Sequence, residues 1–182
     1  MRCWRHWRKR RRASFQFSVV SSGEAGGPTQ AESMTQIAQQ FRADLDEVHH
    51  ALIWVPEALA DVPWRDGGWT RKQIVGHLLD SAANNRQRFV RATSEGSFNG
   101  PNYGQDAWVA AHGYADQTWG TLLGWWEAEH EILMAIVDRI PAERLEAQCV
   151  VGEDAPVTLR FLIEDYVTHQ RWHLKQLLAA SS

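Results

Sequence analysis

The chain has only two cysteines, Cys3 and Cys149, in segments of different character. A disulfide framework is therefore not expected, and we predict free thiols in a reducing compartment such as the cytoplasm. No apolar run approaches the roughly 18 residues of a membrane span, which predicts a soluble protein with no membrane partner. The sequence also lacks a glycine-rich phosphate loop and a nucleophile elbow, so the usual signatures of nucleotide-binding proteins and serine hydrolases are absent.

Acidic residues are scarce at the start of the chain. Residues 1–33 carry seven Lys or Arg and two Glu, whereas the rest carries 12 basic and 20 acidic residues. Because residues 34–182 carry a net negative charge, we do not expect them to bind nucleic acid. We predict a disordered basic tail over residues 1–33 and one folded domain over residues 34–182. A gene start placed too far upstream would also explain the unusual composition of residues 1–33. The alternative for the tail is an arm that binds nucleic acid or membrane.

Apolar residues recur at three- and four-residue steps in four long segments, which predicts amphipathic helices. The segments are residues 35–55, 70–93, 116–140 and 158–178, with a shorter helical stretch from about Asp106. We therefore predict an all-α fold, a four-helix bundle.

The segments between the predicted helices carry turn and capping signals. Thr70 and Gln73 have the spacing of a capping box at the start of the second helix. Residues 94–104 have the composition of a loop. Residues 145–159 alternate weakly around Gly152, which predicts a short hairpin.

The second and fourth predicted helices carry histidines on polar stripes that border their apolar faces. His169 and His173 lie one turn apart, about 40° on the same face. His77 begins a polar line of three turns on the other helix. Two imidazoles at this spacing can bind one metal ion, and a third from a facing helix leaves one coordination position open, as in catalytic zinc sites. The alternative is a pair of ordinary helix histidines that bind nothing.

Three segments carry a family resemblance: GGWTRKQIVGHLLDSAANNRQRF, PNYGQDAW and HQRWH. With them the chain resembles the DinB-like superfamily over roughly residues 34–180, and within it the YfiT-type branch of candidate metal-dependent hydrolases and bacillithiol S-transferases. The resemblance implies an up-down-down-up bundle that often dimerises, and a metal triad at His77, His169 and His173. Gly76 and Trp172 stand where close relatives have further histidines, which leaves the thiol specificity open.

Our first hypothesis is a transferase that joins a low-molecular-weight thiol to a small electrophile. A divalent ion, Zn²⁺ or Ni²⁺, would hold the thiol as a thiolate. Arg88 would bind a carboxylate of the thiol, although it could merely pair with Asp165. Asp80 and Asn84 would orient His77 or the substrate. Asp80 is otherwise an ordinary hydrogen-bonded carboxylate.

Two other hypotheses use the same residues. A water molecule activated by the ion would hydrolyse a small amide or ester, with Asp80 as the base. A bundle that binds metal or ligand without catalysis is the third. In the catalytic hypotheses Tyr103, Asp106 and Trp108 would line the mouth of the site. The remaining histidines of the folded part are predicted to be surface or loop residues: His49, His50, His112 and His130.

Overall fold

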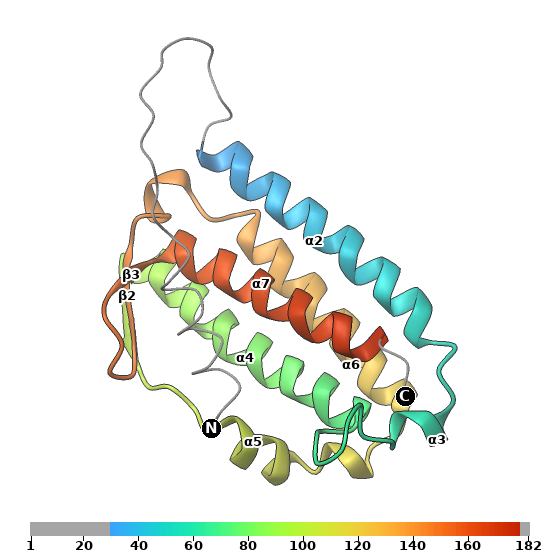
Figure 1. Ribbon diagram of the computed structural model, residues 1–182. Helices are drawn as coiled ribbons and strands as arrows, with labels where there is room; N and C mark the ends of the chain where they lie inside the picture. The colour runs from blue at the N-terminus through green and yellow to red at the C-terminus, as the bar shows by residue number, and fades with distance from the viewer. Residues whose placement is uncertain (1–29, 179–182) are drawn as a thin grey trace.

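Four long helices form a bundle in the computed structural model, which describes residues 30–178. They are α2 (Gln30–Leu52), α4 (Arg71–Glu95), α6 (Trp119–Val137) and α7 (Leu159–Leu178). In Figure 1, α2 and α7 run in one direction and α4 and α6 in the other. The predicted up-down-down-up bundle is confirmed. Residues 1–29 of the predicted tail lie outside the described residues, and α2 begins five residues earlier than predicted.

The core lies between helices that each contact two others. Both α4 and α2 pack against α6 and α7. Tyr166 of α7 lies in the middle, with edge-to-face contacts to Phe41 of α2 and Phe89 of α4 at ring-centroid distances of 6.1 and 6.0 Å. Such aromatic pairs add to the free energy of burial. The core therefore holds α4 and α7 in register, and these are the helices that carry the three histidines of interest.

The start of α4 is fixed as the sequence predicts. The Thr70 hydroxyl accepts a hydrogen bond from the Gln73 backbone amide, and the Gln73 side chain accepts one from the Thr70 amide. The helix ends at Gly96, which has a φ of 81°. Helix α6 begins three residues later than predicted because Thr118 caps its first turn.

A small sheet closes one end of the bundle. Its strands are β1 (Ser97–Gly100), β2 (Gln148–Val151) and β3 (Val157–Thr158). The predicted hairpin is confirmed, since β2 and β3 pair antiparallel. The loop prediction for residues 94–104 is wrong in part, because β1 pairs in parallel with β2. That pairing joins residues about 50 positions apart, so local sequence patterns do not show it.

The connection between α4 and α6 returns along the length of the bundle, because these two neighbours run in parallel (Figure 1). It contains β1, then α5 (Gln105–His112) and the 3₁₀ turn η1 (Tyr114–Asp116). Both α5 and η1 pack against α4. Two further short helices, α3 (Glu57–Ala60) and η2 (Ala142–Arg144), lie in the other connections.

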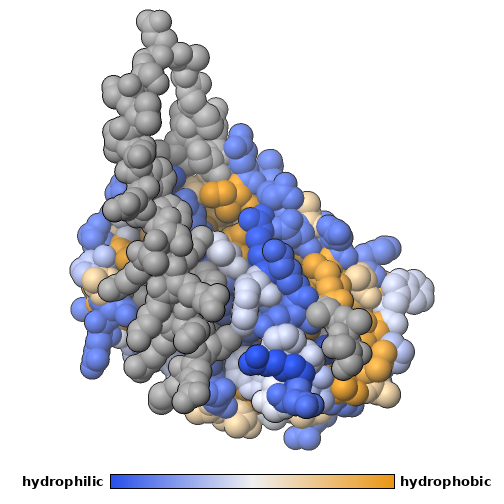
Figure 2. Space-filling model, in the orientation of Figure 1, coloured by the Kyte–Doolittle hydropathy of each residue, from blue (hydrophilic) through white to orange (hydrophobic). Residues whose placement is uncertain are grey.

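One group of exposed apolar side chains lies at an end of the bundle. Figure 2 shows it at the lower right, at the end of the bundle where α2 and α7 terminate. The large exposed apolar residues of this end are Ile53, Trp54, Leu59 and Leu178. No helix within residues 30–178 has the length and apolar character needed to cross a membrane.

Candidate metal centre

The structure brings His77 of α4 together with His169 and His173 of α7. Their candidate ligand atoms all lie within 4.8 Å of one another, and all three side chains are buried. The Nε2 atoms of His77 and His169 are 3.2 Å apart. Within residues 30–178 this is the one group of three or more histidine, cysteine or acidic side chains placed to hold an ion.

The geometry and the hydrogen bonding fit a bound divalent ion. Two nitrogens at 2.0–2.1 Å from a tetrahedral ion are about 3.4 Å apart, close to the distance between His77 and His169. The Nδ1–H of His173 donates to the Gln176 side-chain oxygen at 2.9 Å. This hydrogen bond leaves the Nε2 lone pair of His173 free for the ion. Gln176 lies on the predicted polar stripe, but sequence reasoning assigned it no role.

Burial keeps the three imidazoles neutral. It lowers the pKa of His169 to about 4. The pKa values of His77 and His173 fall well below the usual value, first because of burial and then because of the neighbouring histidines. Metal ligands must be neutral imidazoles, so at pH 7 the cluster is ready to bind an ion.

Two tryptophans flank the triad. The Trp69 ring lies 5.0 Å from the ring of His77, and the Trp172 ring lies 4.5 Å from that of His173. An apolar surround restricts water and lowers the local dielectric constant around a metal site. Trp172 and Trp69 therefore form part of the apolar surround of the triad.

Asp80 lies one turn beyond His77 on α4 and is buried. Its Oδ1 accepts a hydrogen bond from the Tyr114 hydroxyl at 2.7 Å and lies 3.2 Å from Nδ1 of His112. Its Oδ2 is buried and has no hydrogen-bond partner within residues 30–178, and the same holds for Nδ1 of His77. Burial raises the pKa of Asp80, and the contacts with Tyr114 and His112 partly oppose this.

Tyr103 also lies near Asp80, and Arg88 lies near Tyr103. Burial and the Asp80 carboxylate raise the pKa of Tyr103, while Arg88 and a hydrogen bond with Ser81 lower it. Arg88 is buried and donates to the Asn85 side chain at 3.3 Å. The polar side chains predicted on one face of α4 therefore lie next to Tyr103, which belongs to the segment that connects α4 with α6.

The other two predicted contact residues have local partners. The Asn84 amide donates to the Asp80 backbone oxygen at 2.8 Å. Trp108 is partly exposed and its ring lies 4.9 Å from that of Tyr103. Their predicted roles toward a thiol remain predictions.

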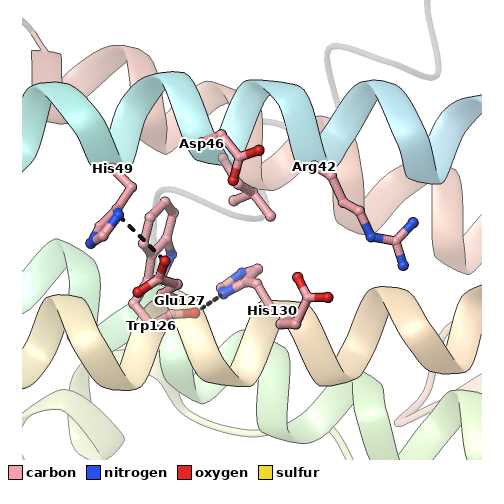
Figure 3. A pocket seen from close by; sticks show the side chains of 8 residues that line it. Arg42, Asp46, His49, Trp126, Glu127 and His130 are labelled. Carbon is pink, nitrogen blue, oxygen red and sulfur yellow. Dashed lines mark hydrogen bonds and ion pairs between the residues drawn. The ribbon is translucent and has the colours of Figure 1, made fainter.

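The prediction for His130 is wrong, because this residue is fully buried in α6. Its Nδ1 lies 2.7 Å from the Trp126 backbone oxygen and its Nε2 lies 3.1 Å from the Gln170 side chain. Burial lowers its pKa to about 4. His130 borders a hollow between α2 and α6, where His49 reaches Glu127 at 3.6 Å (Figure 3). With both ring nitrogens hydrogen-bonded, His130 is a core residue and has no nitrogen left for a metal.

Sequence reasoning missed the part that Tyr114 and His112 play beside Asp80. Their contacts depend on how α5 packs against α4, and on Gly113, whose φ of 60° turns the chain between them. Gly76 also takes part: a Cβ added there would lie 2.1 Å from the Tyr114 ring. The departure of Gly76 from the family pattern is the sequence signal that points to this packing.

The bundle and its histidine cluster define a class of protein, and the comparisons identify the family. The DinB superfamily model matches residues 38–177, and the chain belongs to that superfamily. It is 33% identical over 95 residues to YfiT of Bacillus subtilis, named as a candidate metal-dependent hydrolase, and this match covers 52% of each protein. A similarly named protein of Bacillus pumilus is 33% identical over 64 residues, 35% of this chain and 33% of that one. The chain thus spans about half or less of the curated relatives it matches.

Solved structures show the same fold. The structure of Bacillus subtilis YfiT, described as a four-helix bundle of unusual topology, matches with a TM-score of 0.70 and 22% identity, over 90% of this chain and 93% of that one. A mycothiol-dependent maleylpyruvate isomerase matches with a TM-score of 0.66 and 13% identity, over 85% of this chain and 65% of that one.

Proposed function

We propose that this protein is a metal-dependent S-transferase that joins a low-molecular-weight thiol to a small electrophile. The observation that carries the proposal is the cluster of three buried, neutral histidines with ligand atoms within 4.8 Å. Three neutral ligands leave the charge of a divalent ion uncompensated in a buried site, which favours an anionic, sulfur-bearing partner. The thiol-dependent isomerase that shares the fold supports this choice of substrate class.

When bound, a divalent ion would supply a Lewis acid that lowers the pKa of a thiol at its open position. The chain itself provides the binding groups. Arg88 offers a buried guanidinium for a carboxylate of the thiol. Among residues 30–178, Oδ2 of Asp80 and Nδ1 of His77 have no hydrogen-bond partner, and a polar ligand or ordered water would supply one. Tyr103 and Trp108 form an aromatic wall beside them.

Hydrolysis of a small amide or ester is the second candidate. It is favoured by the buried Asp80 carboxylate, whose Oδ2 has no hydrogen-bond partner in the described part of the chain, and by the names of the curated relatives. The two candidates differ in whether product formation requires a thiol.

The first test is metal binding. Purified protein should contain about one Zn²⁺ or Ni²⁺ per chain by elemental analysis. His169→Ala should lower metal affinity by at least ten- to a hundredfold while the far-UV circular dichroism stays helical, because the residue flanks the core. His50→Ala, an exposed position on α2, is the matched control and should keep its metal. Full occupancy in His169→Ala would contradict the site.

The second test is turnover. Cysteine, glutathione, bacillithiol and mycothiol are each offered with monochlorobimane, and p-nitrophenyl acetate is offered without a thiol. We expect thiol-bimane adduct from one or more thiols, abolished by chelator and in His169→Ala. Ester hydrolysis without adduct would favour the hydrolase. Bound metal with neither reaction would indicate a non-catalytic binding bundle.

A further inference from the structure

His112 and Asp80 form a carboxylate–imidazole pair beside the metal centre. We propose that His112 is the proton acceptor of this site, with Asp80 and Tyr114 as the groups that position it. The proposal rests on the function proposed above, and it applies to a thiol or to a water molecule as the proton donor.

Hydrogen bonding decides which ring nitrogen of His112 carries the proton. Its Nδ1 lies 3.0 Å from the Trp108 backbone oxygen and 3.2 Å from Oδ1 of Asp80. Both partners are acceptors, so Nδ1 must be the protonated nitrogen of the neutral ring. Its Nε2 then has a free lone pair, which is the form of histidine that accepts a proton during catalysis.

The pair is held from a second side by Tyr114. Its ring stacks on that of His112 with centroids 5.1 Å apart and an interplanar angle of 25°. Its hydroxyl donates to the same Asp80 oxygen that faces His112. Gly76 leaves the space in which the Tyr114 ring lies. The orientation of the imidazole is thus fixed by a hydrogen bond, a stacked ring and the packing of η1 on α4.

The location of the pair suits proton transfer. The Asp80 side chain is 2% exposed, whereas that of His112 is 44% exposed. The ring therefore connects a buried carboxylate with the partly exposed aromatic wall of Tyr103 and Trp108. Besides His112, the titratable groups that face the carboxylate are Tyr103 and Tyr114, and Arg88 lies near Tyr103.

A role in packing alone explains the contact between His112 and Asp80 less well than a role in proton transfer. The Trp108 carbonyl, one turn earlier on α5, already satisfies Nδ1 of His112. The second acceptor is a buried carboxylate, and burying such a charge costs free energy. Enzymes use a buried aspartate on Nδ1–H of histidine to fix the tautomer and to stabilise the imidazolium that forms.

The proton balance is as follows for thiol transfer. His112 Nε2 takes the proton of the thiol S–H, and the sulfur lone pair forms the new S–C bond. The leaving group departs with the electron pair of its former bond to carbon. The imidazolium then gives its proton to that leaving group, which restores neutral His112. For an ester, water replaces the thiol as the proton donor and the new bond is O–C.

The pair can be tested by NMR independently of any reaction. The ¹⁵N shifts of the His112 side chain, assigned by their loss in His112→Asn, should show the Nδ1-protonated tautomer in metal-loaded wild type. Asp80→Asn removes the carboxylate acceptor of Nδ1–H, so the Nδ1 shift should move, whereas the Trp108 carbonyl should keep the proton on Nδ1. A wild-type ring protonated on Nε2 would overturn the proposal.

Kinetics test the role of Nε2. The Asn side chain of His112→Asn can still donate to Asp80 but has no Nε2, so kcat/KM should fall at least a hundredfold with unchanged metal content and melting temperature. His112→Ala should lose as much and regain part of its rate with added imidazole. His50→Asn is the matched control. Full activity in His112→Asn would show that the pair is only a clamp, whereas a wild type inactive in both assays would overturn the proposed function as well.

Discussion

Gly76 of α4 affects the site through its contact with the ring of Tyr114. Replacing glycine by alanine inside a helix usually stabilises a protein by about 0.5–1 kcal/mol. At Gly76 we expect the opposite sign, a loss of about 1–3 kcal/mol, because the added methyl would overlap the Tyr114 ring. Urea unfolding measures the difference.

Gly124→Ala is the matched control for this prediction. Gly124 is exposed in α6, and an added Cβ there meets nothing within 4 Å. This variant should gain about 0.5–1 kcal/mol. If both alanine variants were stabilised alike, Tyr114 would not pack against Gly76 in solution.

The predictability of the site differs from residue to residue. His77, His169 and His173 could be predicted, because helical spacing and the family resemblance agree on them. The contacts of His112 and Tyr114 could not, since they depend on the packing of a connection against α4. The burial of His130 could not be predicted, because the sequence around it gives no sign that its two nitrogens find partners inside the core.

At the scale of elements, the capping box of α4 fixes the start of the helix that carries His77. Thr70→Ala should lower the free energy of unfolding by about 1 kcal/mol, because the Gln73 amide loses its acceptor. Thr70→Ser retains the hydroxyl and should stay within a few tenths of a kcal/mol of the wild type. Denaturant titration of the three proteins is the measurement, and equal stabilities would contradict a role for the cap.

Element types were easier to predict than element ends. Long amphipathic periods identified the four helices, and alternation around Gly152 identified the hairpin. The predicted and observed helix ends differ by a few residues where a capping residue such as Thr118 sets the start of the helix. The strand β1 escaped prediction because its pairing with β2 is long-range, and a four-residue strand carries too little pattern of its own.

At the scale of the whole molecule, buried neutral histidines make stability depend on pH. An unfolded histidine has a pKa near 6.5, whereas His130 and His169 have values of about 4 in the folded protein. The unfolded state therefore binds more protons between these values. The contribution of these histidines to the free energy of unfolding is fully present above about pH 6.5 and is lost as the pH falls toward 4.

We expect the free energy of unfolding of metal-free protein to stay level above pH 6.5 and to fall between pH 6.5 and 5, before most carboxylates titrate. Each buried histidine contributes about 1.4 kcal/mol per pH unit. Urea unfolding across this range is the measurement, and His50→Asn should leave the slope unchanged. A level profile down to pH 5 would contradict the burial of neutral histidines.

Bound metal should add stability that chelator removes. An ion present at 100 times its Kd stabilises the folded state by about 2.7 kcal/mol. Chelator should therefore lower the melting temperature of metal-loaded protein near pH 7.5, and should have no effect on His169→Ala. Coincident melting curves with and without chelator, in protein shown to carry metal, would mean that the ion contributes nothing to the fold.

The parallel course of α4 and α6 separates two sets of side chains along the chain. The helices supply the three histidines, whereas the returning connection supplies Tyr103, Trp108, His112 and Tyr114. Apart from Asp80 and Arg88 on α4, the side chains proposed to contact the substrate therefore lie in a different stretch of the gene from the three histidines. We therefore expect that exchanging the exposed positions of residues 97–116 between relatives, with the buried Phe98, Val109 and Tyr114 kept, changes the substrate without disturbing the bundle.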